Sequence, residues 1–199
     1  MNTYLALGDS YTIGEQVPIT GSFPYQLMNK LREAGVQIAA PEIVAVTGYT
    51  GTELEALMAQ HCFAPTYDLV TLLIGVNNQY RGQPVPEFAP SFERLLEAAI
   101  GFSGGRTERV FVLSIPDWGR TPFAKERDVL KIADEIDAYN LFCRKTAEAS
   151  GVDFADITTD QRRHADDPAR LAPDQLHPSA LEYADWAACL FPKILKVLQ

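Results

Sequence analysis

Three side chains in this sequence have the types and the placement suited to nucleophilic catalysis: Ser10, Asp174 and His177. Ser10 directly follows an apolar run, in the stretch LGDS, whereas Asp174 and His177 stand three residues apart in DQLHP. In a tight turn, this spacing lets the carboxylate accept a hydrogen bond from the imidazole Nδ1–H, which leaves Nε2 free as a base. A serine hydroxyl beside such a base can act as a nucleophile in acyl transfer.

A hydroxyl nucleophile also needs donors for the negative charge that develops on the attacked oxygen. Gly48, in VTGYTG, can offer a backbone N–H from a turn where a side chain would block approach. Asn77, in IGVNNQYRG, can offer its side-chain amide. Each residue also has an ordinary structural explanation: Ser10 can cap a helix, Gly48 can belong to a plain turn, and Asn77 or Asp174 can cap a loop. The presence of all these residues together is harder to explain by structural roles alone.

Five short apolar runs predict the strands that position these residues. Three of the runs are almost continuous in Val, Ile, Leu and Phe, which is typical of strands covered on both faces in a parallel sheet. Segments with apolar residues three and four apart predict helices between them. The expected strands are 4–8, 42–46, 69–75, 109–115 and 152–156, and the expected helices are 23–34, 52–61, 86–101, 129–147 and 179–198. Alternation of this kind predicts an α/β sandwich.

Polar and glycine-rich residues follow the expected strands. Ser10 follows the first strand, Gly48 the second and Asn77 the third, and the segment 157–177 after the fifth delivers the acid and the imidazole. Ligands of open α/β sheets bind at the carboxyl ends of the strands, so we expect one site at this edge. The segment 157–177 is polar and contains two prolines, which predicts a long loop that is either functional or disordered.

The composition narrows the function classes. The 199 residues show no repeat or linker and are expected to form one domain, 1–199. With 17 basic and 26 acidic residues, the net charge of −9 disfavours nucleic-acid binding and docking on an anionic membrane. The three cysteines are scattered and predict neither a zinc site nor a disulfide framework. No signal peptide or membrane-spanning run is recognisable, which favours a cytoplasmic location without membrane insertion.

Four segments, in this order, resemble the sequence blocks of the SGNH or GDSL-type hydrolases, a family of esterases and lipases: LALGDSYTIG, VTGYTG, IGVNNQYRG and DQLHP. The resemblance covers nearly the whole chain. It implies a three-layer α/β/α sandwich with a flavodoxin-like, five-stranded parallel sheet of order 2-1-3-4-5. It also implies a small-molecule ester as substrate and no metal or organic cofactor.

The resemblance further implies a role for each candidate residue. Ser10 is the nucleophile, Asp174 and His177 complete the triad, and Ser10, Gly48 and Asn77 form the oxyanion hole. Two positions depart from the family pattern. Tyr11 replaces the leucine of GDSL, at a position expected to face the site only marginally. Asn78 stands where the family often has Asp, a change expected to affect the hydrogen bonds that orient Asn77.

Aromatic residues near these blocks are candidates for the substrate-binding rim. They are Tyr11, Tyr49, Tyr80 and Trp118, with Phe123 nearby. Aromatic rings suit sugars or short acyl groups, and short loops predict an open, shallow site. We therefore expect short-acyl esters such as acetylated carbohydrates. A lysophospholipase or thioesterase for longer acyl chains is the alternative within the family.

Three other classes are compatible with parts of the sequence. A metal-dependent phosphoesterase could use Asp9, Asn77, Asp174 and His177 as ligands, but such sites usually contain more carboxylates and histidines. A non-catalytic binding module on the same fold is disfavoured because the nucleophile and the base are both present. A nucleotide-binding protein is disfavoured because the chain has neither a G-x-G-x-x-G motif nor a P-loop lysine.

Overall fold

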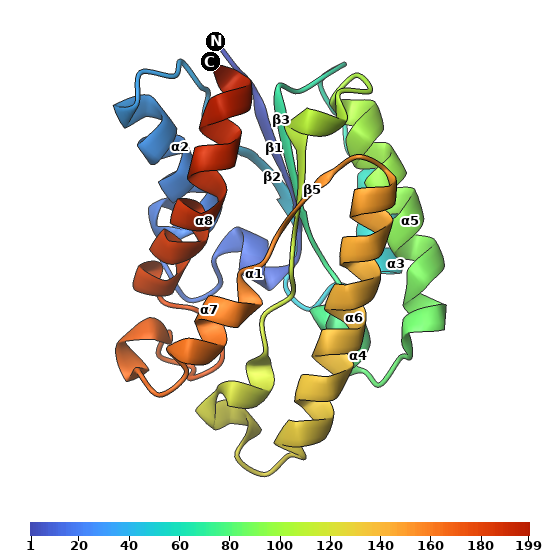
Figure 1. Cartoon of the computed structure of the whole chain (residues 1–199), viewed down its shortest axis with the longest axis vertical. Coiled ribbons are helices and arrows are strands. Elements are labelled where there is room, and N and C mark those ends of the chain that lie inside the picture. The colour runs from blue at the N-terminus through green and yellow to red at the C-terminus, as the bar shows by residue number, and fades with distance from the viewer.

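The computed structural model describes residues 1–199 and has a five-stranded parallel sheet as its central layer (Figure 1). The strands are β1 (Tyr4–Gly8), β2 (Glu42–Ala45), β3 (Leu69–Leu73), β4 (Val110–Leu113) and β5 (Asp153–Ala155). They lie in the order β2-β1-β3-β4-β5, and every neighbouring pair is parallel. The predicted fold class, a three-layer α/β/α sandwich with strand order 2-1-3-4-5, is therefore confirmed.

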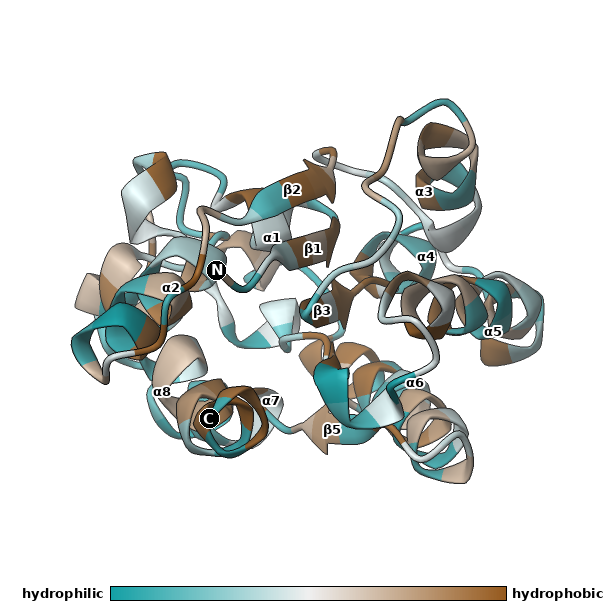
Figure 2. Ribbon diagram, turned by 90° about the horizontal axis from the view of Figure 1, so that it is seen from above, coloured by the Kyte–Doolittle hydropathy of each residue, from teal (hydrophilic) through white to brown (hydrophobic).

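Long helices cover both faces of the sheet. One face carries α2 (Phe23–Glu33) and α8 (Ala180–Leu198), which pack on each other, and the other carries α3 (Gly51–Met58), α5 (Val85–Phe102) and α6 (Val129–Ala149). Figure 2 looks along the strands and shows the two helical layers with the sheet between them. Every residue of β1, β3 and β4 is buried, which explains why these strands are apolar at each position.

Three short helices lie at the carboxyl edge of the sheet, at the ends of β1, β3 and β5. They are α1 (Ser10–Ile13), α4 (Val76–Tyr80) and α7 (Thr158–Arg163). Five 3-10 turns complete the connections: η1 (Ile19–Gly21), η2 (Thr107–Arg109), η3 (Trp118–Arg120), η4 (Pro122–Ala124) and η5 (Pro168–Arg170). The sequence predicted none of these elements.

The prediction that 157–177 is a long loop was wrong. The segment contains α7 and η5, and two arginines fasten it to the rest of the molecule. Arg162 pairs with Asp117 at 2.9 Å, and Arg170 pairs with Glu182 at 3.0 Å. Only its last two residues, Leu176 and His177, line the pocket at the sheet edge, so the rest of the segment does not cover that pocket.

No helix in the chain combines the length and the apolar character that crossing a bilayer requires.

Candidate active site

Ser10 is placed by a sharp turn between β1 and α1. Asp9 is the N-cap of α1: its buried carboxylate accepts a hydrogen bond from Tyr11 N–H at 3.0 Å. Ser10 is thus the first residue of the helix, and its side chain is free of the capping role. Gly8 makes the turn possible, because a Cβ there would lie 2.1 Å from the Thr12 hydroxyl and 2.4 Å from the Leu73 carbonyl oxygen.

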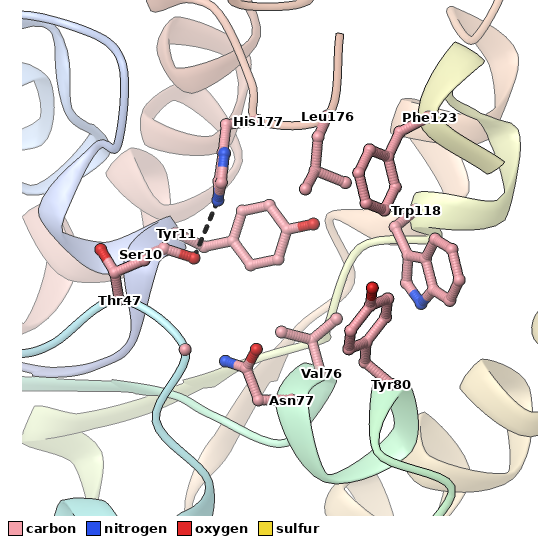
Figure 3. A pocket seen from close by; sticks show the side chains of 11 residues that line it. Ser10, Tyr11, Thr47, Val76, Asn77, Tyr80, Trp118, Phe123, Leu176 and His177 are labelled. Atoms are coloured by element: carbon pink, nitrogen blue, oxygen red, sulfur yellow. Dashed lines mark hydrogen bonds between the residues drawn. The ribbon is translucent and has the colours of Figure 1, made fainter. Parts of the chain in front are cut away.

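Ser10, His177 and Asp174 form a continuous hydrogen-bonded chain. Ser10 Oγ lies 3.0 Å from His177 Nε2, and His177 Nδ1 lies 2.6 Å from Asp174 Oδ2. Figure 3 shows the imidazole pointing toward the hydroxyl, with the dashed line marking this contact. The carboxylate fixes the imidazole tautomer with a proton on Nδ1, so Nε2 can accept the serine proton.

Asp174 is held in its charged form. Partial burial opposes ionisation, but hydrogen bonds from the His177 ring and from the backbone N–H groups of His177 and Leu176 outweigh it and lower the pKa of Asp174. The two backbone donors bind Oδ1, at 3.1 and 3.0 Å, while Oδ2 receives the imidazole. Each carboxylate oxygen therefore has a separate role.

Hydrogen-bond donors surround the space beside Ser10 Oγ. The backbone N–H groups of Ser10 and Gly48 donate to no other group of the protein. Gly48 has a φ of 81° and lies in the turn after β2. This is the left-handed region of backbone conformations, which glycine adopts without strain. The Asn77 amide, from α4, donates to the Tyr49 carbonyl at 3.0 Å and to Asp9 Oδ2 at 3.3 Å. In Figure 3, Asn77 reaches into the pocket from the side opposite His177.

Two features around Gly48 were not anticipated from the sequence. Arg81 donates to the Gly48 carbonyl at 2.7 Å and to Glu53 at 3.2 Å, which ties the end of α4 to the Gly48 turn. The Asn78 side chain makes no hydrogen bond to Asn77. Its side-chain amide oxygen instead accepts a hydrogen bond from Gly51 N–H at 3.0 Å, at the start of α3. The change at Asn78 therefore does not alter the hydrogen bonds that orient Asn77, contrary to expectation. The Arg81 contact is a tertiary one, which no local sequence pattern contains.

A pocket of about 210 Å³ opens beside Ser10. Figure 3 shows its far side formed by Tyr80, Trp118 and Phe123, whose ring centroids lie 5.1 to 6.4 Å apart. Trp118 is held in place, since its Nε1–H donates to Gln79 at 2.7 Å. The complete lining is Ser10, Tyr11, Thr47, Gly48, Val76, Asn77, Tyr80, Trp118, Phe123, Leu176 and His177.

Most of the expected aromatic residues reach this pocket. Tyr80 and Trp118 line it, and so does Tyr11, whose ring centroid is 5.6 Å from that of His177. Tyr11 therefore faces the site more directly than the sequence suggested. Tyr49 does not line the pocket with its side chain and contributes only the carbonyl that binds Asn77. Val76 and Leu176 line it as well, although as single apolar residues they carried no signal in the sequence.

Asp9 is an unusual acid, because it is completely buried beside the candidate site. Burial raises the pKa of Asp9 to about 7, despite hydrogen bonds from Tyr11 N–H and the Asn77 amide. The folded protein then keeps this proton to a higher pH than the unfolded chain does. The Asp9 contribution to the free energy of unfolding therefore falls as the pH rises from about 4 to about 7 and stays low above that range.

We expect Asp9→Asn to remove most of this pH dependence. Between about pH 4 and pH 8, the unfolding free energy of the wild-type protein should fall by roughly 4 kcal/mol relative to that of the variant. Urea denaturation of both proteins across this range measures the difference, because all other titrating groups are shared. Parallel stability curves would show that the buried carboxylate does not titrate in this window.

The fold and the geometry together define a class of protein. A serine, an imidazole and a carboxylate joined by hydrogen bonds, at the carboxyl edge of a parallel sheet and beside free N–H donors, are characteristic of serine hydrolases. The model of the GDSL-like lipase/acylhydrolase family matches residues 6–184. The chain belongs to this family, and it is a carboxylic ester hydrolase of the SGNH or GDSL type.

Solved structures agree with this fold. TesA is 16% identical, with a TM-score of 0.74, and the match covers 98% of this chain and 99% of TesA. The lipase/acylhydrolase from Enterococcus faecalis is 19% identical, with a TM-score of 0.73 and coverage of 98% and 96%. Axe2, an acetylxylan esterase from Geobacillus stearothermophilus, is 20% identical, with a TM-score of 0.72 and coverage of 97% and 94%. No curated protein matches the sequence.

Proposed function

We propose that this protein hydrolyses carboxylic esters through an acyl-enzyme on Ser10. His177 Nε2 takes the hydroxyl proton while Ser10 Oγ attacks the ester carbonyl, and Asp174 stabilises the resulting imidazolium. His177 then returns the proton to the leaving alcohol. A water molecule repeats the sequence on the acyl-enzyme and releases the acid. The observation that carries the proposal is the unbroken chain of hydrogen bonds, 3.0 Å and 2.6 Å long, from Ser10 to Asp174.

The negative oxygen of the tetrahedral intermediate is stabilised by the Ser10 and Gly48 N–H groups and the Asn77 amide. The first two donors have no other acceptor in the protein. Both N–H bonds of the Asn77 amide already have acceptors, in Tyr49 and Asp9. The contact with Asp9 is the longer one, at 3.3 Å, so we propose that this N–H is shared with or transferred to the oxyanion as it forms.

Asn77→Ala is expected to lower kcat by about 10²- to 10³-fold, with a smaller change in KM, because an oxyanion donor acts mainly in the transition state. Steady-state kinetics with a soluble p-nitrophenyl ester measure the effect. Asn78→Ala is the matched control, since its side chain binds Gly51 and lies outside the proposed oxyanion hole. An equal loss of kcat in both variants would indicate a general disturbance of α4 and contradict the assignment.

The pocket supports an apolar acyl group as its occupant. Its far side is aromatic, and Trp118 Nε1 and the Thr47 hydroxyl are already engaged, with Gln79 and Glu15. Outside the proposed catalytic residues, the Tyr11 and Tyr80 hydroxyls are the side-chain polar groups that remain for a ligand. A sugar would need several free polar partners, whereas an acyl chain needs none. This favours the longer-chain alternative over the acetylated carbohydrates expected from the sequence. A volume of about 210 Å³ suits one acyl chain rather than a larger ligand.

The test is a comparison of p-nitrophenyl acetate, butyrate, octanoate and palmitate, together with an acetylated xylo-oligosaccharide. We expect kcat/KM to rise from acetate to butyrate or octanoate and to fall for palmitate, whose chain exceeds the pocket. A maximum at acetate, with faster turnover of the acetylated sugar, would favour the carbohydrate esterase instead. Failure to hydrolyse any ester while folded would contradict the proposed function and leave a binding module as the alternative.

A further inference from the structure

Trp118 is the buried member of the three aromatic rings that line the pocket. It is 5% exposed, whereas Tyr80 and Phe123 are 47% and 44% exposed. Its ring centroid lies 5.1 Å from that of Tyr80 and 6.2 Å from that of Phe123, and Figure 3 shows the three rings together on the side of the pocket away from Ser10. Two rings that are themselves half in solvent hold the indole only loosely, so its orientation depends on another contact.

That contact is a hydrogen bond to Gln79, a buried residue of α4. Trp118 Nε1–H donates to Gln79 Oε1 at 2.7 Å, and Gln79 Nε2 donates in turn to Glu135 in α6 at 2.8 Å. An indole nitrogen can only donate and a carboxylate can only accept, so these partners allow the Gln79 amide one orientation. Gln79 does not line the pocket, and the indole N–H is therefore directed out of the pocket.

The Trp118 side chain makes no other hydrogen bond. The Trp118 carbonyl accepts from the Thr121 N–H at 3.1 Å and the Thr121 hydroxyl at 2.7 Å, and Asp117 accepts from Gly119 N–H at 3.0 Å. These bonds fix the backbone of η3 but not the side-chain torsions of Trp118. Without Gln79, the indole N–H would either stay buried without an acceptor, which is unfavourable, or turn toward water in the pocket.

We infer that Gln79 is a positioning residue for the acyl chain: it holds the ring carbons of Trp118, rather than the N–H, toward the pocket and thereby favours acyl groups long enough to reach that ring. The inference rests on the proposed function, because it names a determinant of acyl selectivity at that site. A wall that is fixed before binding loses no conformational freedom when the chain arrives, so its contacts contribute fully to affinity. An indole that turned its N–H into the pocket would present a donor that an alkyl chain cannot bind.

A purely structural explanation is that Gln79 only attaches α4, which carries Asn77, to α6. A second attachment already does this. The Tyr139 hydroxyl, from α6, donates to the Gln83 carbonyl at 2.6 Å, and the Gln83 side chain accepts from Asn78 at 2.8 Å. We therefore expect α4 to keep its place when Gln79 is replaced, which leaves the orientation of Trp118 as the feature that changes.

The experiment compares wild type and Gln79→Leu on p-nitrophenyl acetate and octanoate. The octanoyl chain can reach Trp118, and its kcat/KM should fall about tenfold, mainly through a higher KM. An acetyl group ends beside Ser10, so its kcat/KM should change by less than about threefold, since it makes little contact with that ring. A general loss of activity would lower both values and cancel in the octanoate-to-acetate ratio.

Three further variants separate positioning from other effects. Asn78→Ala, at the next buried residue of α4, and Glu135→Gln, which keeps an acceptor for Gln79, should both retain the wild-type ratio. Trp118→Phe should lower the ratio by itself. Adding Gln79→Leu to Trp118→Phe should then change it little, because no indole N–H remains to be positioned. Additive effects of the two substitutions would show that Gln79 does not act through Trp118 and would overturn the inference.

NMR provides a readout that does not require hydrolysis. The chain has two tryptophans, and Trp118→Phe assigns their indole N–H signals. In Gln79→Leu, solvent exchange of the Trp118 N–H should accelerate about tenfold or more, whereas Trp186, which donates to Glu182 at 3.1 Å, should not change. Unchanged exchange at Trp118, or an unchanged octanoate-to-acetate ratio in a protein that hydrolyses both esters, would contradict the inference.

Failure of the proposed function has a different signature. If the folded protein hydrolysed no ester, the binding of octanoate to wild type and Gln79→Leu, followed by the indole signals, would replace the kinetic comparison. A dissociation constant about tenfold higher in the variant would still support positioning of an acyl chain by Gln79. Equal dissociation constants would overturn it.

Discussion

Ser10→Ala is expected to lower kcat/KM for p-nitrophenyl esters by about 10⁴- to 10⁶-fold. Without the hydroxyl, no acyl-enzyme forms, and the remaining donors can assist only direct attack by water. The fold should be unaffected, because Asp9 rather than Ser10 caps α1 and Ser10 Oγ bonds only to His177. Steady-state kinetics and urea denaturation of the two proteins measure the two effects separately.

A covalent probe tests the same assignment without turnover. A fluorophosphonate should add one adduct to the wild-type protein and none to Ser10→Ala, as measured by intact-protein mass spectrometry. Ser150→Ala is the matched control, because Ser150 terminates α6 and lies outside the pocket lining. If Ser10→Ala is labelled to the same extent as the wild-type protein, or keeps its activity, another nucleophile carries the reaction.

The sheet could be predicted from the sequence because three of its strands, β1, β3 and β4, are buried on both faces. A strand such as β3 is then apolar at every position, and a parallel sheet with helical connections is the arrangement that such runs favour. The short helices could not be predicted. With four to six residues, α1, α4 and α7 are too short to be stable alone and depend on contacts such as the Asp9 cap.

The positions of Ser10 and Asn77 could be predicted because each follows a strand, and strand ends meet at one edge of the sheet. The tertiary hydrogen bonds around these residues could not be predicted. The Arg81 contact with the Gly48 carbonyl joins residues 33 positions apart, and the Asn77 contact with Asp9 joins residues 68 apart. Such contacts depend on the packed geometry, and a sequence pattern does not encode them.

The segment 157–177 illustrates the same limit. Its polar composition predicts a loop, yet largely buried ion pairs at Arg162 and Arg170 hold it against the connection between β4 and η3 and against α8. Removing one partner of a pair that is largely shielded from solvent costs more than removing a surface pair. The polar residues in this segment therefore stabilise the approach to His177, so their abundance is not a sign of disorder.

Asp174→Asn is expected to lower kcat by about 10⁴-fold at neutral pH. The two backbone donors that bind Asp174 Oδ1 would retain the amide oxygen in that position. The amide nitrogen would then face His177 Nδ1, where the carboxylate oxygen now lies at 2.6 Å. An amide N–H can donate there only if Nδ1 has no proton, which moves the proton to Nε2. An imidazole in that tautomer cannot accept the proton of Ser10.

Asp167→Asn is the matched control for charge and position, because Asp167 also caps a turn of the same segment, through Ala169 N–H, but lies outside the pocket lining. Its kcat should stay within a few-fold of the wild-type value. NMR of the imidazole nitrogens provides the second readout: the proton should be on Nδ1 of His177 in the wild-type protein and on Nε2 in Asp174→Asn. A loss of kcat without this change of tautomer would mean that Asp174 acts through its charge alone, whereas full activity of Asp174→Asn would remove it from the catalytic chain.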